Sequence, residues 1–77
     1  MILVTTSHGP SFVGRNRADV VRQMRDDAWL QGTGKGDYMN SVADRVSQQK
    51  GRRPRTTVDG FIEDLQDLGY LREELLH

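Results

Sequence analysis

Four carboxylates recur late in the sequence, at Asp59, Glu63, Asp64 and Asp67. Two carboxyl groups can hydrolyse a glycosidic bond as an acid and base pair when they face each other across a pocket. Here the spacing follows the turns of a helix instead, and apolar residues occupy the intervening positions. We therefore expect the four side chains to form a solvated acidic face of that helix, which could bind a basic groove on a protein partner.

Nucleophilic catalysis and metal binding have little support from the sequence. The two histidines are His8, which follows Ser7, and His77. Neighbouring side chains on an extended chain point apart, so Ser7 and His8 are not placed as a nucleophile and its base. A zinc site needs clustered His or Cys ligands, and cysteine is absent. We expect no catalytic residues, no metal and no cofactor, and thus a protein that is not an enzyme.

A glycine-rich segment with one lysine, residues 31–36, invites comparison with phosphate-binding loops. In a P-loop the Gly-Lys pair is followed by Ser or Thr, but Gly36 follows Lys35 here, and Trp29 stands where the first glycine belongs. The dinucleotide-binding fingerprint is also missing, because no strand precedes the segment and the glycine spacing differs. The segment is predicted to be a flexible connector.

Charge is sorted along the sequence although the formal net charge is zero. Residues 15–55 carry ten basic and five acidic side chains, whereas residues 56–77 carry one basic and six acidic ones. The two halves could neutralise each other in the fold, or they could form interaction surfaces. The basic tract, residues 50–55, could contact phosphates or the carboxylates of a partner. The arginines proposed for such contacts are Arg52, Arg53 and Arg55, supported by Arg22 and Arg25.

The acidic residues lie in the segment with the clearest helical pattern. Its apolar residues fall on one stripe and are Val58, Phe61, Ile62, Leu65 and Leu68. Thr56 followed by Asp59 resembles a capping box at the start of the helix. Gly69 suits the left-handed residue that ends a helix, and Tyr70 beyond it can fold back on the apolar residues. These features predict a helix over residues 57–68.

The rest of the chain is predicted from similar patterns. Apolar, β-branched residues on either side of a turn predict a β-hairpin over residues 2–13 with at least one open edge, which could pair with a second copy of the chain or with a strand of a partner. Helices are predicted at about 17–29, capped by Asn16, and at 37–50, capped by Asp37 and ended by Gly51. Trp29 is expected to close the core. The tail, residues 70–77, could be helical, and the basic tract could add a short strand.

Together these elements predict one α+β domain over residues 1–77, an N-terminal hairpin packed on three helices in the order ββααα. No apolar run is long enough to cross a membrane, and the lack of cysteine suits a reducing compartment, so we expect a cytoplasmic protein without membrane contact.

The functional expectation is a small non-enzymatic module that binds a protein partner through charged helix and loop surfaces. Small proteins of this kind occur among the accessory proteins of phages and mobile elements, some of which inhibit host nucleic-acid-binding complexes by presenting carboxylates in place of phosphates. The alternative is a nucleic-acid-binding regulator that uses the basic tract. A helix, a connector and a second helix over about residues 37–71 resemble helix-turn-helix modules. However, the exposed side of the helix that would enter the DNA groove is acidic. The pI of about 6.7 is also low for a nucleic-acid-binding domain.

Overall fold

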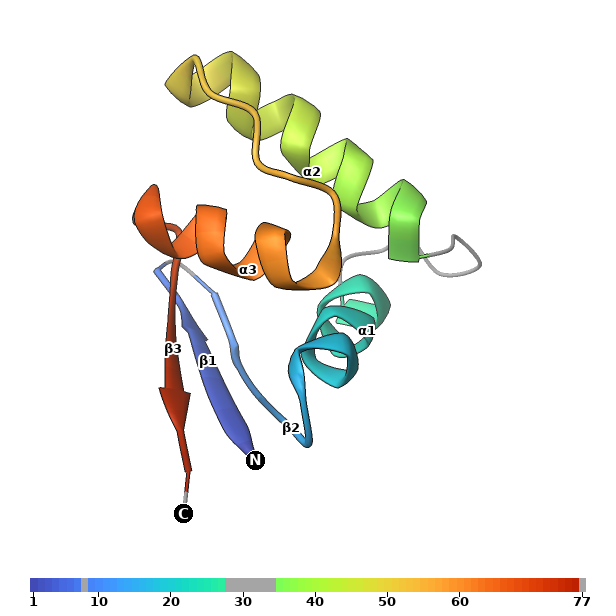
Figure 1. Ribbon diagram of the computed structural model, residues 1–77, viewed down its shortest axis with the longest axis vertical. Helices are drawn as coiled ribbons and strands as arrows, with labels where there is room; N and C mark the ends of the chain where they lie inside the picture. Colours follow the sequence, from blue (N-terminus) through green and yellow to red (C-terminus); the bar gives the residue numbers. More distant parts are fainter. Residues whose placement is uncertain (8, 28–34, 77) are drawn as a thin grey trace.

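The computed structural model describes residues 1–7, 9–27 and 35–76 (Figure 1). Its strands are β1 (Ile2–Thr6), β2 (Ser11–Gly14) and β3 (Leu71–Leu75), and its helices are α1 (Arg17–Asp27), α2 (Lys35–Lys50) and α3 (Val58–Asp67). The chain is therefore an α+β domain of three antiparallel strands and three helices. The hairpin and the helices are confirmed, whereas the order is ββαααβ because a third strand follows the last helix.

The third strand changes what was expected of the tail and of the hairpin edges. The sheet has the order β2-β1-β3, and Leu3 of β1 lies opposite Val13 on one side and Glu74 on the other. The tail is thus a strand and not a helix, because pairing with β1 satisfies the backbone groups of both segments. β1 is the central strand, so of the two hairpin strands only β2 lies at an edge of the sheet. The basic tract adds no strand.

Helix α3 begins at Val58 and ends at Asp67, one residue inside the predicted range at each end. Thr57, with an extended backbone, is the N-cap, and its hydroxyl accepts a hydrogen bond from the N–H of Gly60 at 3.2 Å, so the cap predicted at Thr56 is wrong. Gly69 has a φ of +84°, and the N–H of Tyr70 donates to the carbonyl of Leu65 at 2.9 Å. This pattern is the Schellman arrangement that a left-handed residue permits.

The boundaries of α1 and α2 agree with the sequence in part. Asn16 caps α1 by accepting from the N–H of Asp19 at 2.9 Å, as predicted. α2 begins at Lys35, so Asp37 lies in its first turn and is not the cap. Gly51 ends α2 with a φ of +71°. The predicted end of α1 at residues 28–29, the role of Trp29 and most of the glycine-rich connector lie outside the described residues.

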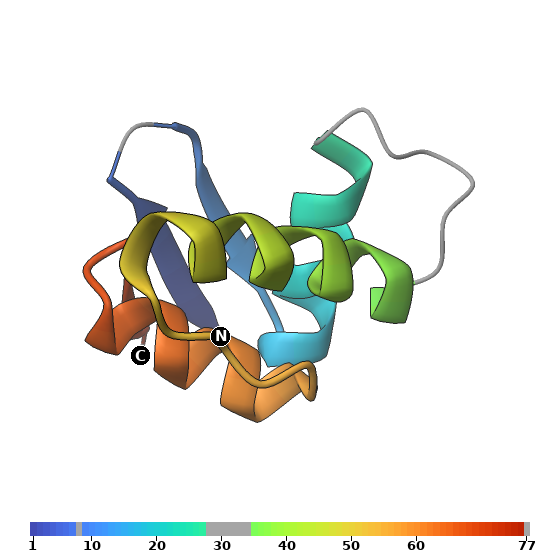
Figure 2. The same ribbon diagram turned by 90° about the horizontal axis from the view of Figure 1, so that it is seen from above.

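The core lies between the helices and one face of the sheet (Figures 1 and 2). Burial alternates along β1, where Ile2 and Val4 are buried while Thr5 is exposed. Tyr38 of α2 meets Phe61 of α3 edge to face, with ring centroids 6.1 Å apart. Phe61 is fully buried. None of the described helices is long and apolar enough to span a membrane.

Candidate functional site

Three carboxylates form an exposed row on α3, which we call the acidic stripe: Asp59, Glu63 and Asp67. They recur every fourth residue and therefore lie on one side of the helix. The side chain of Asp59 is 79% exposed and that of Glu63 is 50% exposed. The opposite side of α3 is buried in the core. The stripe is thus presented on a helix whose position is fixed by packing.

The fourth predicted carboxylate, Asp64, does not belong to this surface. It is only 5% exposed, and its Oδ2 accepts from the backbone N–H of Arg55 at 2.8 Å and from Arg55 Nε at 3.0 Å. These hydrogen bonds, first from the side chain and then from the backbone, hold the pKa of Asp64 below its ordinary value. The prediction that Asp64 faces solvent is wrong, because the tract before α3 folds back over this carboxylate.

Gly60 explains how the tract comes so close to α3. A Cβ at Gly60 would lie 2.8 Å from the Cβ of Arg55 and 2.7 Å from Thr57 Oγ1. Such separations are shorter than van der Waals contact, so a side chain at this position would push the tract outward. The glycine therefore costs some helix propensity but allows Arg55 to reach Asp64.

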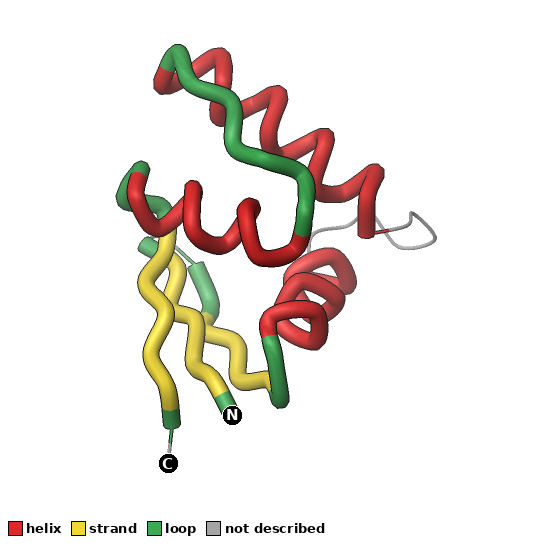
Figure 3. The backbone as a smooth tube through the Cα atoms, viewed as in Figure 1, coloured by secondary structure: helices red, strands yellow, loops and turns green. Residues whose placement is uncertain are grey.

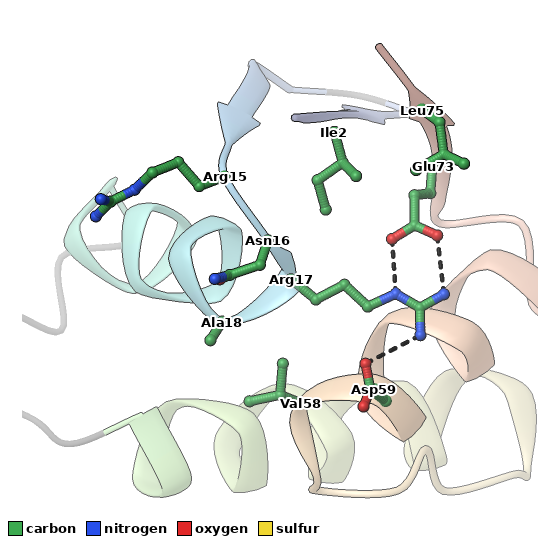
Figure 4. Close-up of a pocket in the computed structure, with 9 residues that line it drawn as sticks. All are labelled: Ile2, Arg15, Asn16, Arg17, Ala18, Val58, Asp59, Glu73 and Leu75. Atoms are coloured by element: carbon green, nitrogen blue, oxygen red, sulfur yellow. Dashed lines mark hydrogen bonds and ion pairs between the residues drawn. The ribbon is translucent and has the colours of Figure 1, made fainter. Parts of the chain in front are cut away.

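Arg17, at the start of α1, connects two carboxylates of the stripe to the sheet, and Figure 4 shows its contacts with Asp59 and Glu73. Its Nε and Nη2 donate to Glu73 of β3 at 2.7 and 2.8 Å, and its Nη1 donates to Asp59 and Glu63, each at 3.1 Å. The pKa of Glu73 is lowered chiefly by these bonds, and the pKa of Arg17 is raised by the same contact. Both groups therefore stay charged near neutral pH, and the cluster holds charge without being poised to transfer a proton.

The basic tract contacts the helices on either side of it through ion pairs and hydrogen bonds. Figure 3 shows it running between α2 and α3. Arg53 pairs with Asp44 of α2 and donates to Asn40 at 3.0 Å, and Pro54 is fully buried. Arg52 lies 3.6 Å from Asp64. The tract therefore neutralises carboxylates of this chain, which is the internal alternative left open by the charge pattern.

The two supporting arginines are also paired, within α1. Arg22 pairs with Asp19 at 2.6 Å and lies 3.7 Å from Asp26, and Arg25 pairs with Asp26 at 3.0 Å. They lie on α1 and pair with carboxylates of that helix, whereas the basic tract lies between α2 and α3. The structure thus does not gather the predicted phosphate-contacting arginines into one unpaired basic surface.

Two grooves cross the described surface. One, of about 710 Å³, lies between the sheet and the starts of α1 and α3, and Arg17, Val58 and Leu75 help to line it (Figure 4). The other, of about 390 Å³, lies beside α2, and Met24, Leu65 and Arg45 help to line it. No group of three His, Asp or Glu residues within the described ranges is placed to hold a metal. His8 and His77, the candidate bases, lie outside those ranges.

The Arg17–Glu73 pair is not predicted from the sequence. The sequence patterns place Arg17 in a helix and Glu73 in the tail, and they indicate no contact between the two. The signal that could have found them is the alternation of Leu71 and Glu73 with Arg72 and Glu74, which suits a strand with one buried face. Comparisons with protein-family models, with curated proteins and with solved structures found no match for this chain.

Proposed function

We propose that this protein is a small non-enzymatic interaction module whose acidic stripe binds a protein partner with a basic surface. The observation that supports the proposal most directly is the presentation of the stripe. Its helix is anchored by buried Phe61, Ile62 and Leu65, and Arg17 holds two of its carboxylates in place. Groups held in their binding geometry lose less conformational entropy when a partner arrives.

The charge and spacing of the acidic stripe indicate which kind of partner surface would be complementary to it. Carboxylates four residues apart on a helix form a row with a spacing of about 6 Å. A groove lined by Lys and Arg is complementary to such a row, and nucleic-acid-binding proteins carry grooves of this kind. Within the proposal, the protein occupies a nucleic-acid-binding surface of its partner in place of phosphates, as an inhibitory accessory protein of a phage or mobile element would.

Nucleic-acid binding by the basic tract is the less favoured alternative. Arg52, Arg53 and Arg55 each pair with a carboxylate of this chain. A phosphate contact would compete with these internal pairs, just as a partner of the stripe would compete with Arg17 for Asp59 and Glu63. The acidic stripe on α3 would also repel a phosphate backbone brought near the tract.

Removing negative charge from the stripe should weaken the binding of the partner without unfolding the protein. The test uses the double variant Asp59→Asn/Asp67→Lys and a matched control, Asp27→Asn/Asp37→Lys, which alters exposed acidic residues elsewhere and changes the net charge equally. Each variant is used in a quantitative pull-down from native lysate, followed by calorimetric titration of the identified partner. We expect affinity to fall at least about tenfold in the stripe variant and little in the control.

Two results would count against the proposal. Equal retention of the partner by the stripe variant and the control would remove the stripe from the interface. Binding of nucleic acid that weakens steeply with salt, and is lost in Arg52→Ala/Arg53→Ala/Arg55→Ala, would favour the tract instead. Thermal unfolding of each variant shows whether a loss of binding reflects a loss of structure.

A further inference from the structure

The groove beside α2, which we call the α2 groove, has the size and the apolar lining of a small-molecule site. Its volume of about 390 Å³ falls within the roughly 300–1,000 Å³ of sites that bind small molecules. Much of its lining consists of apolar side chains that belong to the core or pack against it: Met24, Val42, Val46, Leu65 and Leu71. Because these residues come from three helices and a strand, the packing of the domain fixes the shape of the groove.

Most polar groups of the lining are engaged within the chain. The hydroxyl of Thr6 donates to the carbonyl of Pro10 at 2.7 Å, and the hydroxyl of Ser7 donates to the carbonyl of Tyr70 at 3.2 Å. The hydroxyl of Tyr70 in turn donates to Gln49 Oε1 at 2.7 Å. The three hydroxyl protons are therefore already used, and none of them is left to bind a ligand.

Two side-chain donors of the lining remain, and both lie on α2. Arg45 is exposed, and no ion pair or hydrogen bond joins it to another side chain in the part of the chain that the structure describes. Gln49 accepts from Tyr70 through Oε1, which leaves the N–H groups of its amide as donors. Side chains four residues apart on a helix are neighbours. The guanidinium and the amide can therefore bind the same group of a ligand.

The charge of the α2 groove favours an anionic ligand. Arg45 is the single charged residue of the lining within the described ranges. Lys50 adds a second positive charge nearby, because its Nζ lies 5.7 Å from the ring centroid of Tyr70, which also lines the groove. A carboxylate accepts two parallel hydrogen bonds from a guanidinium, and such charged pairs are stronger than neutral ones. The lining thus complements a molecule with an apolar body and a carboxylate at one end.

A peptide segment would fit this lining less well. An extended peptide brings backbone N–H groups, each of which needs an acceptor when it is buried. The side-chain groups left over in the lining are donors, those of Arg45 and Gln49. A buried N–H without an acceptor costs more free energy than a typical hydrogen bond contributes. A small molecule with a single acidic group makes no such demand.

We propose that the α2 groove binds a small carboxylic acid with an apolar chain, and that Arg45 and the amide of Gln49 bind its carboxylate. The chain lies against the apolar lining, which removes its surface from water. Leu65 contributes to the groove from the buried side of α3, whereas the acidic stripe lies on the exposed side. The two surfaces therefore do not overlap. The site does not depend on the function proposed above, and either could fail alone.

Three probes that share one apolar chain and differ in the head group test the proposal: octanoate, octanol and octylammonium. Each is titrated to millimolar concentration into the isotope-labelled full chain, and the amide resonances are followed by NMR. We expect octanoate to bind at least about tenfold more tightly than the other two, because only its head pairs with the guanidinium. The resonances of Val42, Gln49 and Leu71 should shift in a saturable way.

Three results of this titration would overturn the proposal. The first is octanoate binding no more tightly than octylammonium, and the second is octanoate shifting the resonances of Ala18 and Val58 in the other groove instead. The third is tighter binding of the peptide Gly-Gly-Leu, whose terminal carboxylate follows an apolar side chain. That result would make the end of a protein chain the better occupant.

Removal of the positive charge tests the role of Arg45. Arg45→Gln should weaken the binding of octanoate about tenfold and leave that of octanol unchanged, because only the charged head loses its partner. Arg15→Gln is the matched control, since it removes the same charge from an exposed residue of the other groove. Equal losses in the two variants would exclude a specific contact with Arg45. Thermal unfolding of each variant checks that it folds.

Gln49→Glu tests the second donor. The new carboxylate can still accept from Tyr70, but it replaces the amide donors and pairs with Arg45 one turn away. The preference for octanoate over octylammonium should therefore disappear. Gln48→Glu is the control, because it adds the same charge at an exposed neighbour outside the lining and should keep the preference. A preference that survives in Gln49→Glu would contradict the proposed site.

Discussion

Phe61→Ala is expected to lower the free energy of unfolding by about 3–5 kcal/mol. Phe61 is fully buried where α3 meets the sheet and α2, and its ring contacts Tyr38 edge to face. Truncation removes the apolar contacts and leaves a cavity that a small core cannot fill. Because a domain of 77 residues has a total stability of roughly 4–12 kcal/mol, the variant should be close to unfolding at room temperature.

Urea unfolding followed by circular dichroism measures this effect. Leu75→Ala is the control, because Leu75 is apolar but 70% exposed, and its truncation should change the stability by no more than about 0.5 kcal/mol. A Phe61→Ala variant as stable as this control would mean that α3 is not packed into the core. The stripe would then lack its rigid support, and the proposed binding surface would fail with it.

Arg17→Met is expected to destabilise the protein by about 2–3 kcal/mol at neutral pH. The substitution keeps much of the apolar stem but removes the donors that serve Glu73, Asp59 and Glu63. Glu73, with a side chain only 15% exposed, would be left near the carboxylate of Asp59 without its partner. Arg15→Met is the matched control, since the Arg15 side chain is exposed and has no ion pair in the described part of the chain.

The pH dependence of this loss has a definite sign. In the unaltered protein the pKa of Glu73 is lowered, so its pair with Arg17 stabilises the fold above the unfolded-state pKa and is lost as pH falls through the folded-state pKa. Without Arg17, burial and the charge of Asp59 would raise the pKa of Glu73 instead. The difference in stability between the two proteins should therefore shrink on acidification. A difference that is constant from neutral to acid pH would contradict the cluster.

Local patterns predicted most of the helical structure. The cap at Asn16, the left-handed residues Gly51 and Gly69, and the apolar face of α3 depend on neighbours within a few positions. Spacing in the sequence determines such features, so the sequence shows them directly. The third strand is different, because Leu71–Leu75 is a strand only through its pairing with β1 at the opposite end of the chain.

The sequence predicts the candidate site only in part, because some of its contacts join segments that are far apart in the sequence. The row formed by Asp59, Glu63 and Asp67 follows from helical spacing alone. The burial of Asp64 does not, because it depends on the tract that Gly60 admits against the helix. The role of Arg17 was also hidden, since its partners come from α3 and β3, more than forty residues away in sequence.

Helix α3 therefore carries carboxylates in two environments, one buried and the others exposed, and this difference bears on the two functional proposals. Asp64 points inward and holds Arg55 of the basic tract, while the stripe points outward, where Asp59 and Glu63 are exposed beside Arg17. If Asp64 were solvated, Arg52 and Arg55 would lose a shared internal partner and could contact phosphates more readily. The state of this one carboxylate thus bears on which surface binds.

An NMR titration of the side-chain carboxyl carbons tests this division most directly. With an unstructured aspartate peptide as reference, the carboxyl of Asp64 should titrate below the ordinary aspartate range, because Arg55 donates to its charged form from both side chain and backbone. Titration of Asp64 within or above that range would contradict the account, since the basic tract would then not be bound to α3.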